Sequence, residues 1–155
     1  MRTYKFRMYP NKEQQSKLWC HANKLNWLYN YFLNQKIESY KNEKKNLKRF
    51  DLQSQLPELK ANDSELKEIH SQILQGVCKS LDQSYKDFFK RKNIGFPKFR
   101  SCKNFYGICY PQSGYSLSDS VFKTKVYGSI PLKKHRDING NVKTVHITTS
   151  NNKWF

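Results

Sequence analysis

The chain changes its hydrophobic period at one corner, Gly95-Phe96-Pro97. Before this corner, apolar residues recur at steps near 3.6, as in helices, and after it they form short runs typical of strands. Pro97 cannot continue a helix and favours an extended Phe96, while Gly95 permits the backbone reversal that is common at helix ends. The corner therefore separates a helical part from a β part, which predicts an α+β fold.

Cations and aromatic rings crowd this corner. Cations attract phosphates and aromatic faces stack on bases, so the combination favours nucleic acid. A helix end with a solvated basic rim explains the pattern equally well. For Phe96 and Phe99, packing at a domain junction is the favoured interpretation. The residues concerned are Tyr85, Phe88, Phe89, Lys90, Arg91, Lys92, Phe96, Lys98, Phe99 and Arg100.

The net charge of +17 limits the partners of the chain. Its 29 Lys and Arg against 12 Asp and Glu would repel one another in a compact fold unless a polyanion were nearby. Such a polyanion is either nucleic acid or an acidic membrane surface. The sequence has no long apolar segment, so we expect a soluble cytoplasmic protein with no membrane partner.

The cysteines and histidines are too dispersed to indicate a metal site. No Cys-x-x-Cys pair occurs, and no His stands four residues from another His or Cys. Small buried thiols in a reducing compartment are the favoured interpretation of the cysteines, and no cofactor is expected. The residues are Cys20, Cys78, Cys102, Cys109, His21, His70, His135 and His146.

The N-terminal third predicts a strand followed by a long helix. Residues 2–9 alternate between two faces, as a half-buried strand does, and Pro10 ends the run. Asn11 and Gln14 are spaced as a capping box. Helical spacing of apolar residues then predicts one helix over residues 12–41. Its apolar stripe consists of Leu18, Ala22, Leu25, Tyr29, Phe32 and Tyr40.

Two further helices are predicted before the corner. A short one, capped by Asp51, carries Leu52, Leu56 and Leu59. A second apolar stripe from Leu66 to Phe88 predicts a helix of about 28 residues that packs on the first. Its polar face holds amide and hydroxyl groups. Such a face is usually only solvated, but against nucleic acid its groups suit base edges. They belong to Ser71, Gln72 and Gln75.

Past the corner the chain predicts a basic antiparallel sheet or small barrel. Asn139-Gly140 signals a type I′ hairpin. From residue 93 onward only two acidic residues stand against ten Lys and Arg. The sheet would recruit the first strand, so residues 1–10 and 93–155 would form one β unit with 11–92 as a helical insertion. The predicted strands cover residues 104–110, 121–127, 129–133 and 142–149, and Lys153-Trp154-Phe155 resembles the opening of another.

Five motifs occur in order along the chain: Tyr9-Pro10-Asn11, Trp27-Leu28-Tyr29-Asn30, the run from Leu66 to Gln75, Tyr85-Lys86-Asp87-Phe88-Phe89, and Gly95-Phe96-Pro97-Lys98-Phe99. In this order they resemble the N-terminal part of the TnpB (OrfB-type) proteins, which are transposon-encoded RNA-guided DNA endonucleases related to type V CRISPR effectors. The resemblance covers essentially the whole chain.

The resemblance implies that the β unit is a wedge domain and that the helical insertion is a recognition domain, whose first part is described as a helix-turn-helix region. The implied partners are a guide RNA derived from the transposon end and a double-stranded DNA target, in the cytoplasm and nucleoid of a prokaryote. The implied readers of a short DNA motif beside the target are Phe50, Ser54, Ser71, Gln72, Gln75, Tyr110, Pro111 and Gln112.

Contacts to the nucleic-acid backbone are expected from basic residues in both predicted domains. Lys98 and Arg100 at the corner are the leading candidates, because they flank the junction. The full set is Lys5, Arg7, Lys90, Arg91, Lys98, Arg100 and Lys103.

No catalytic residue is expected in this chain. In the family, a RuvC domain supplies the carboxylates that hold divalent metal ions and carries a zinc finger, and neither part matches these residues. Asp119 and Asp137 stand isolated in a basic region, whereas two-metal cleavage needs clustered carboxylates. The expected function is therefore nucleic-acid binding without cleavage. Two alternatives remain: half of an active nuclease completed by a separate C-terminal part, and a duplex-DNA regulator that works without RNA.

Overall fold

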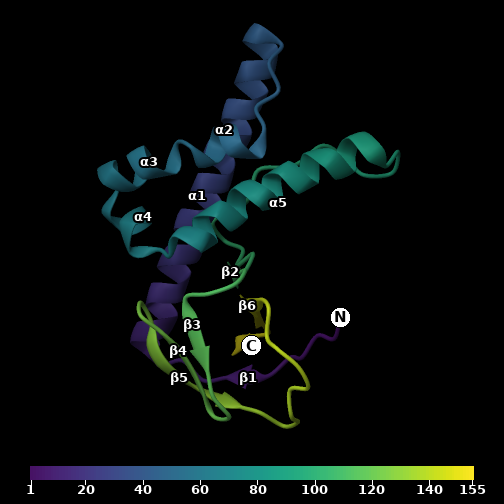
Figure 1. Cartoon of the computed structure of the whole chain (residues 1–155). Helices are drawn as coiled ribbons and strands as arrows, with labels where there is room; N and C mark the ends of the chain where they lie inside the picture. The colour runs from purple at the N-terminus through teal and green to yellow at the C-terminus, as the bar shows by residue number, and fades with distance from the viewer. The chain divides into compact units, whose positions relative to one another are not determined.

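The structure, a computed structural model, describes all 155 residues (Figure 1). The chain divides into two compact units: unit 1 consists of Met1–Ala22 and Phe105–Phe155, and unit 2 of Asn23–Asn104. This division lies after residues 22 and 104, whereas the sequence suggested domain boundaries after residues 10 and 92. Unit 1 is mainly β-sheet and unit 2 is helical, so the α+β prediction is confirmed.

Unit 1 is built on a six-stranded antiparallel sheet in the order β3-β4-β5-β1-β8-β7, with a separate two-stranded sheet β2-β6. As predicted, the first strand is recruited, and it lies between β5 and β8. The sheet does not close into a barrel. The strands are β1 (Arg7–Met8), β2 (Ile108–Tyr110), β3 (Tyr115–Leu117), β4 (Val121–Thr124), β5 (Gly128–Lys133), β6 (Val145–Ile147), β7 (Thr149–Ser150) and β8 (Lys153–Trp154).

Except for β5, these strands are shorter than the predicted ones, and β3 was not predicted. The first strand in particular keeps only two residues, although Phe6 remains buried ahead of it. The predicted alternation of buried and exposed side chains therefore extends to residues that form no strand hydrogen bonds. The opening of a strand near the last residues is confirmed by β8.

The core of unit 1 lies between the six-stranded sheet and the first turns of helix α1 (Lys12–Glu43). Trp19 of α1 packs edge-on against Phe105 and Trp154, at ring distances of 5.1 and 6.4 Å. His21, also on α1, is buried and shares a 2.8 Å hydrogen bond with the Tyr127 hydroxyl. Aromatic packing and this buried polar pair therefore fix the helix on one face of the sheet.

The predicted capping box at the start of α1 is confirmed. The backbone N–H of Gln14 donates to Asn11 Oδ1 at 2.8 Å, and the backbone N–H of Asn11 donates to Gln14 Oε1 at 3.0 Å. The Gln14 side chain also donates from Nε2 to the carbonyls of Tyr127 and Ser129, both at 2.9 Å. One side chain thus caps the helix and holds the β4–β5 turn.

The predicted hairpin at Asn139-Gly140 is wrong. The strands on its two sides do not pair: β5 pairs with β1 and β4, and β6 pairs with β2. The Asn139 N–H instead donates to the Tyr4 hydroxyl at 3.2 Å. A type I′ turn occurs instead at Asn151-Asn152, which connects β7 to β8. The φ values of these two residues are 49° and 58°. Asn tolerates this left-handed conformation, so both Asn-containing pairs carry a turn signal and only tertiary pairing decides between them.

Unit 2 holds the rest of α1 and four more helices: α2 (Arg49–Gln53), α3 (Leu56–Asn62), α4 (Ser64–Glu68) and α5 (Ser71–Lys90). The long helix α1 is confirmed, but the predicted single short helix is two helices. Asp51 does not occupy the N-cap position expected for it. It is the third residue of α2, and its carboxylate accepts from the Lys48 N–H at 2.8 Å.

The predicted second long helix is broken into α4 and α5 at Ile69 and His70. Ile69 is extended, with ψ at 135°, and the His70 Nδ1 accepts from the Gln72 N–H to cap α5. Leu66 and Ile69 are nevertheless buried, as their place in the apolar stripe predicted. The side-chain cap at His70 competes with a continuous helix here, while the burial pattern is unchanged.

Lys36 is a buried cation that joins three segments of unit 2. Its Nζ donates to the Leu47 carbonyl and to Asn46 Oδ1, and it lies 4.3 Å from the centre of the Tyr85 ring on α5. Burial lowers the pKa of this amine. Lys36 therefore fixes the connector after α1 and holds α1 against α5, which crosses it in Figure 1.

Substitution Gln14→Ala should lower the free energy of unfolding of the chain by about 2 kcal/mol, because it removes the bond from the Asn11 N–H to Gln14 Oε1 and two bonds to the β4–β5 turn. Thermal and urea unfolding measure the change. The matched control is Gln83→Ala on α5, which loses one exposed bond to Asp87 and should change stability by less than about 0.5 kcal/mol. Equal effects of the two substitutions would contradict this role of Gln14.

Candidate nucleic-acid interface

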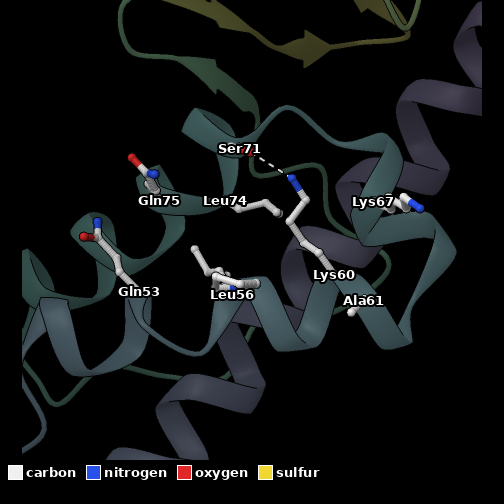
Figure 2. Close-up of a pocket in the computed structure, with 9 residues that line it drawn as sticks. Gln53, Leu56, Lys60, Ala61, Lys67, Ser71, Leu74 and Gln75 are labelled. Atoms are coloured by element: carbon white, nitrogen blue, oxygen red, sulfur yellow. Dashed lines mark hydrogen bonds between the residues drawn. The ribbon is translucent and has the colours of Figure 1, made fainter.

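An open pocket of about 530 Å³ in unit 2 lies between α3 and the start of α5 (Figure 2). We call it the helical groove. No Asp or Glu lines it. Its lining residues are Gln53, Leu56, Pro57, Lys60, Ala61, Lys67, Ser71, Leu74 and Gln75.

Polar groups of the helical groove come from four helices, α2 to α5. Lys60 of α3 donates from Nζ to the Ser71 hydroxyl of α5 at 2.8 Å. Figure 2 shows Gln53 and Gln75 projecting at the same end of the groove, away from the Lys60–Ser71 bond. Amides and hydroxyls suit base edges and amines suit phosphates, so one groove offers both kinds of contact.

Two of the predicted motif readers, Ser71 and Gln75, line this groove, whereas the half-buried Gln72 does not. Three other polar lining residues, Gln53, Lys60 and Lys67, were not predicted from the sequence. Gln53 directly precedes a predicted reader and could have been found by allowing a shift of one residue. Nothing in the sequence indicated Lys60, because a contact between α3 and α5 places it.

The two readers predicted on α2 lie outside the groove lining. Phe50 is 71% exposed, with the Arg49 guanidinium 4.8 Å from its ring centre. The Ser54 hydroxyl donates to the Asp51 carbonyl at 2.8 Å. Phe50 is thus an accessible ring beside a cation, while the hydroxyl of Ser54 is already engaged at the end of α2.

Of the readers predicted in unit 1, Tyr110 is placed in the core. Its side chain is 1% exposed and packs edge-on against Tyr115 and Phe122. This burial raises the pKa of Tyr110 to about 12. The prediction that its side chain reads DNA is therefore wrong, since a base edge cannot reach it. Pro111 is half-buried and Gln112 is exposed.

Two amide side chains of α1 hold the chain that follows the Gly-Phe-Pro corner. Asn30 donates from Nδ2 to the Arg100 carbonyl at 2.9 Å and accepts the Arg100 N–H at 2.7 Å. Asn26 donates from Nδ2 to the carbonyls of Ser101 and Asn104, at 3.3 and 3.1 Å. This irregular segment is thus anchored although it belongs to no helix or strand.

The anchor also places the Arg100 side chain. Its guanidinium lies 3.9 Å from the centre of the Tyr29 ring, next to Asn30 on α1. It also reaches the Ser80 hydroxyl of α5 at 3.5 Å. Arg100, the residue directly after the Gly95–Phe99 motif, is therefore held over Tyr29 of the Trp27–Asn30 motif. A phosphate contact by this residue stays a prediction.

The corner itself differs from the prediction in two ways. α5 ends because Arg91 is extended, with φ at −117° and ψ at 116°, and Gly95 does not take the left-handed conformation expected of it. Phe99 is not packed in a core, since it is 55% exposed. Phe96 is 44% exposed and leans edge-on against Tyr85 and Phe88.

The corner lies inside unit 2. Its predicted backbone contacts are accessible, because all of them except Arg100 are exposed. These are Lys90, Arg91, Lys98 and Lys103. In unit 1, Lys5 is exposed and Arg7 half-buried beside β1.

Acidic and sulfur groups form no cluster. No group of three or more His, Cys, Asp or Glu side chains is placed to hold a metal ion. Lys134 lies 2.8 Å from Asp119 and 3.9 Å from Asp137, so these two loop carboxylates share one cation. Of the cysteines only Cys78 is buried, which corrects the expectation of buried thiols, and burial raises its pKa to about 12.

Comparison with known proteins gives two matches. A family model described as a helix-turn-helix domain, of the OrfB type found in IS605, matches residues 1–45. The candidate RNA-guided DNA endonuclease InsQ of Escherichia coli strain K12 is 29% identical over 160 residues. The resemblance to TnpB proteins is confirmed. The aligned region covers 100% of this chain and 39% of InsQ, so the TnpB-like chain spans well under half the length of this relative.

The residues matched by the helix-turn-helix model contain β1 and α1. They hold one helix of 32 residues, not two short helices joined by a tight turn. Separately, no helix of the chain combines the length and the apolar character that a membrane span requires.

Substitution Asn30→Ala should release the segment around Arg100, because it removes both hydrogen bonds to that residue's backbone. We expect the Arg100 amide to exchange its hydrogen at least about tenfold faster, with stability lowered by about 2 kcal/mol. Hydrogen exchange read by NMR measures the first effect. The control is Asn34→Ala, an exposed position one turn later on α1, which should leave this amide protected. Unchanged exchange in Asn30→Ala would contradict the anchor.

Proposed function

We propose that this TnpB-like chain is a nucleic-acid-binding module and that the helical groove of unit 2 reads a short duplex motif beside a DNA target. The observation that carries the proposal is the lining of the groove, where Gln53 and Gln75 share one surface with the bonded pair Lys60 and Ser71 and no carboxylate is present. A duplex offers base edges to the amides and hydroxyl and phosphates to the amine. The match to InsQ, named for RNA-guided DNA cleavage, supports a guide RNA as the second partner.

We further propose that these residues bind nucleic acid and leave cleavage to a part of the protein outside them. Cleavage by two metal ions needs several carboxylates around one point. The two carboxylates beyond the corner, Asp119 and Asp137, lie beside Lys134, which competes with a metal ion for both. Metal ions and zinc then belong to a separate C-terminal nuclease part, and this module needs no cofactor.

A second candidate is a duplex-DNA regulator that works without RNA, which the helix-turn-helix description of residues 1–45 favours. The single helix in those residues argues against it. RNA that copurifies with the chain from cells, survives a wash at low salt and maps to a transposon end would support the guided module. Its absence would support the regulator.

Binding of the chain to duplex DNA and to structured RNA should fall steeply with salt, because the Lys and Arg of a chain with net charge +17 displace counterions from the phosphates. Fluorescence anisotropy at increasing salt concentration measures the slope. A slope that corresponds to several phosphate contacts is expected for both ligands. The absence of binding even at low salt would remove the proposed function.

Substitution Gln75→Ala should flatten sequence preference without changing the salt slope, because an amide at the groove reads bases and does not pair with phosphates. The assay is selection from a library of duplexes randomised over a short window, with sequencing of the bound fraction. We expect discrimination at one or two adjacent base pairs to fall by about tenfold, since a bidentate contact contributes about 1 to 3 kcal/mol.

The matched control is Gln83→Ala, an exposed glutamine two turns further along α5 and outside the groove lining. It should select the same motif as the unaltered chain. Lys98→Ala at the corner should instead weaken all duplexes alike and reduce the salt slope. If Gln75→Ala selects the original motif at full strength, the groove is not the reading site.

A further inference from the structure

The six-stranded sheet of unit 1 has two chemically different faces. Register places Arg7 opposite Lys133 and Lys123 opposite Ser129, while Met8 faces Leu132. Met8 and its neighbours on that face are buried under α1 and the aromatic core. We call the other side the outer sheet face; it carries Lys5, Arg7, Tyr9, Lys123, Ser129, Pro131, Lys133, Lys153 and Phe155.

The charge of the outer sheet face has one sign. It holds five cations, and no strand of this sheet contains an Asp or Glu. None of these five cations forms a salt bridge, whereas other lysines of the chain, such as Lys134 and Lys86, do. Cations gathered on one face without salt bridges attract a polyanion.

Aromatic rings stand between these cations. The Lys5 Nζ lies 4.0 Å from the centre of the Phe155 ring, and the Arg7 guanidinium lies 5.5 Å from Phe155 and 5.3 Å from Tyr9. Tyr9 is 50% exposed. Lys5 and Arg7 thus rest on π faces, and neither forms a salt bridge with an Asp or Glu.

The backbones that carry both rings are fixed. The Tyr9 N–H donates to the Pro131 carbonyl at 2.9 Å. Phe155 and Thr148 exchange two backbone hydrogen bonds, both at 2.9 Å. The rings are therefore held on the sheet before any ligand arrives, which reduces the entropy lost on binding.

We propose that the outer sheet face binds an unpaired nucleic-acid strand, with bases stacked on Tyr9 and Phe155 and phosphates held by the surrounding cations. A strand whose bases are free can use aromatic faces, whereas the bases of a duplex are already stacked on one another. Phosphates draw Lys5 and Arg7 off the rings, and the uncovered rings then receive bases. This recognition tolerates any sequence and uses no residue of the helical groove. This inference takes from the proposed function only that the partner is a nucleic acid.

The experiment compares a short oligothymidine strand with an abasic strand of the same length and charge. The full chain carries Tyr9→Leu, which keeps an apolar side chain and removes the ring. We expect Tyr9→Leu to weaken oligothymidine binding by about tenfold, as the loss of one stacked base predicts, and to leave abasic binding unchanged. Fluorescence anisotropy measures both affinities. The control is Tyr40→Leu, an exposed tyrosine at 58% on the last turns of α1.

Lys133→Gln tests the cations of the same face. It should weaken both strands and reduce the salt slope by about 0.7, the value for one phosphate on a single strand. Lys86→Gln, whose amine is paired with Asp82, should do neither. Melting curves of each variant confirm that it is folded.

The outcomes separate this inference from the proposed function. Oligothymidine binding unaffected by Tyr9→Leu, or an equal loss on the abasic strand, would overturn stacking and leave only a basic surface that an acidic protein would fit as well. Loss of motif selection in Gln75→Ala with normal oligothymidine binding would support both surfaces. If the unaltered chain selects no motif from the duplex library while Tyr9→Leu still weakens oligothymidine binding, the groove proposal is removed and this inference is kept.

Discussion

Amide side chains on α1 hold the irregular parts of both units. In unit 2, Asn30 takes up both backbone groups of Arg100, and Asn26 binds two further carbonyls of the same segment. In unit 1, Gln14 binds two carbonyls of the β4–β5 turn. Backbone polar groups outside helices and sheets need such partners. The segment after the corner and the β4–β5 turn are thus both held by one helix.

The excess of cations over carboxylates shapes the surface as strongly as the core shapes the fold. With 29 Lys and Arg against 12 acidic residues, many cations rest on aromatic rings: Lys5 and Arg7 on Phe155, Arg49 on Phe50, Arg100 on Tyr29. A cation over a ring gains less at an exposed site than one beside a phosphate in a charge-assisted bond. The exposed pairs are therefore ready to exchange partners, whereas Arg100 is fixed by its anchored backbone.

The spacing of apolar residues and the local helix caps could be predicted from the sequence. They gave α1, its capping box with Gln14, and the recruitment of the first strand into the sheet. They did not give the break at Ile69 and His70, because a periodic stripe is buried equally well by two helices as by one. They misplaced the type I′ turn, because Asn139-Gly140 carries the local signal but its flanking strands pair elsewhere.

The same distinction explains which site residues were predictable. Ser71 and Gln75 were found because an amphipathic helix exposes a polar face wherever its apolar stripe is buried, and this follows from α5 alone. Lys60 enters the groove through its bond to Ser71, and Tyr110 leaves the surface through packing on Phe122; both facts depend on pairs distant in sequence. A helical face can thus be assigned from one segment, whereas the members of a groove or a sheet core require the pairing of segments, which spacing does not encode.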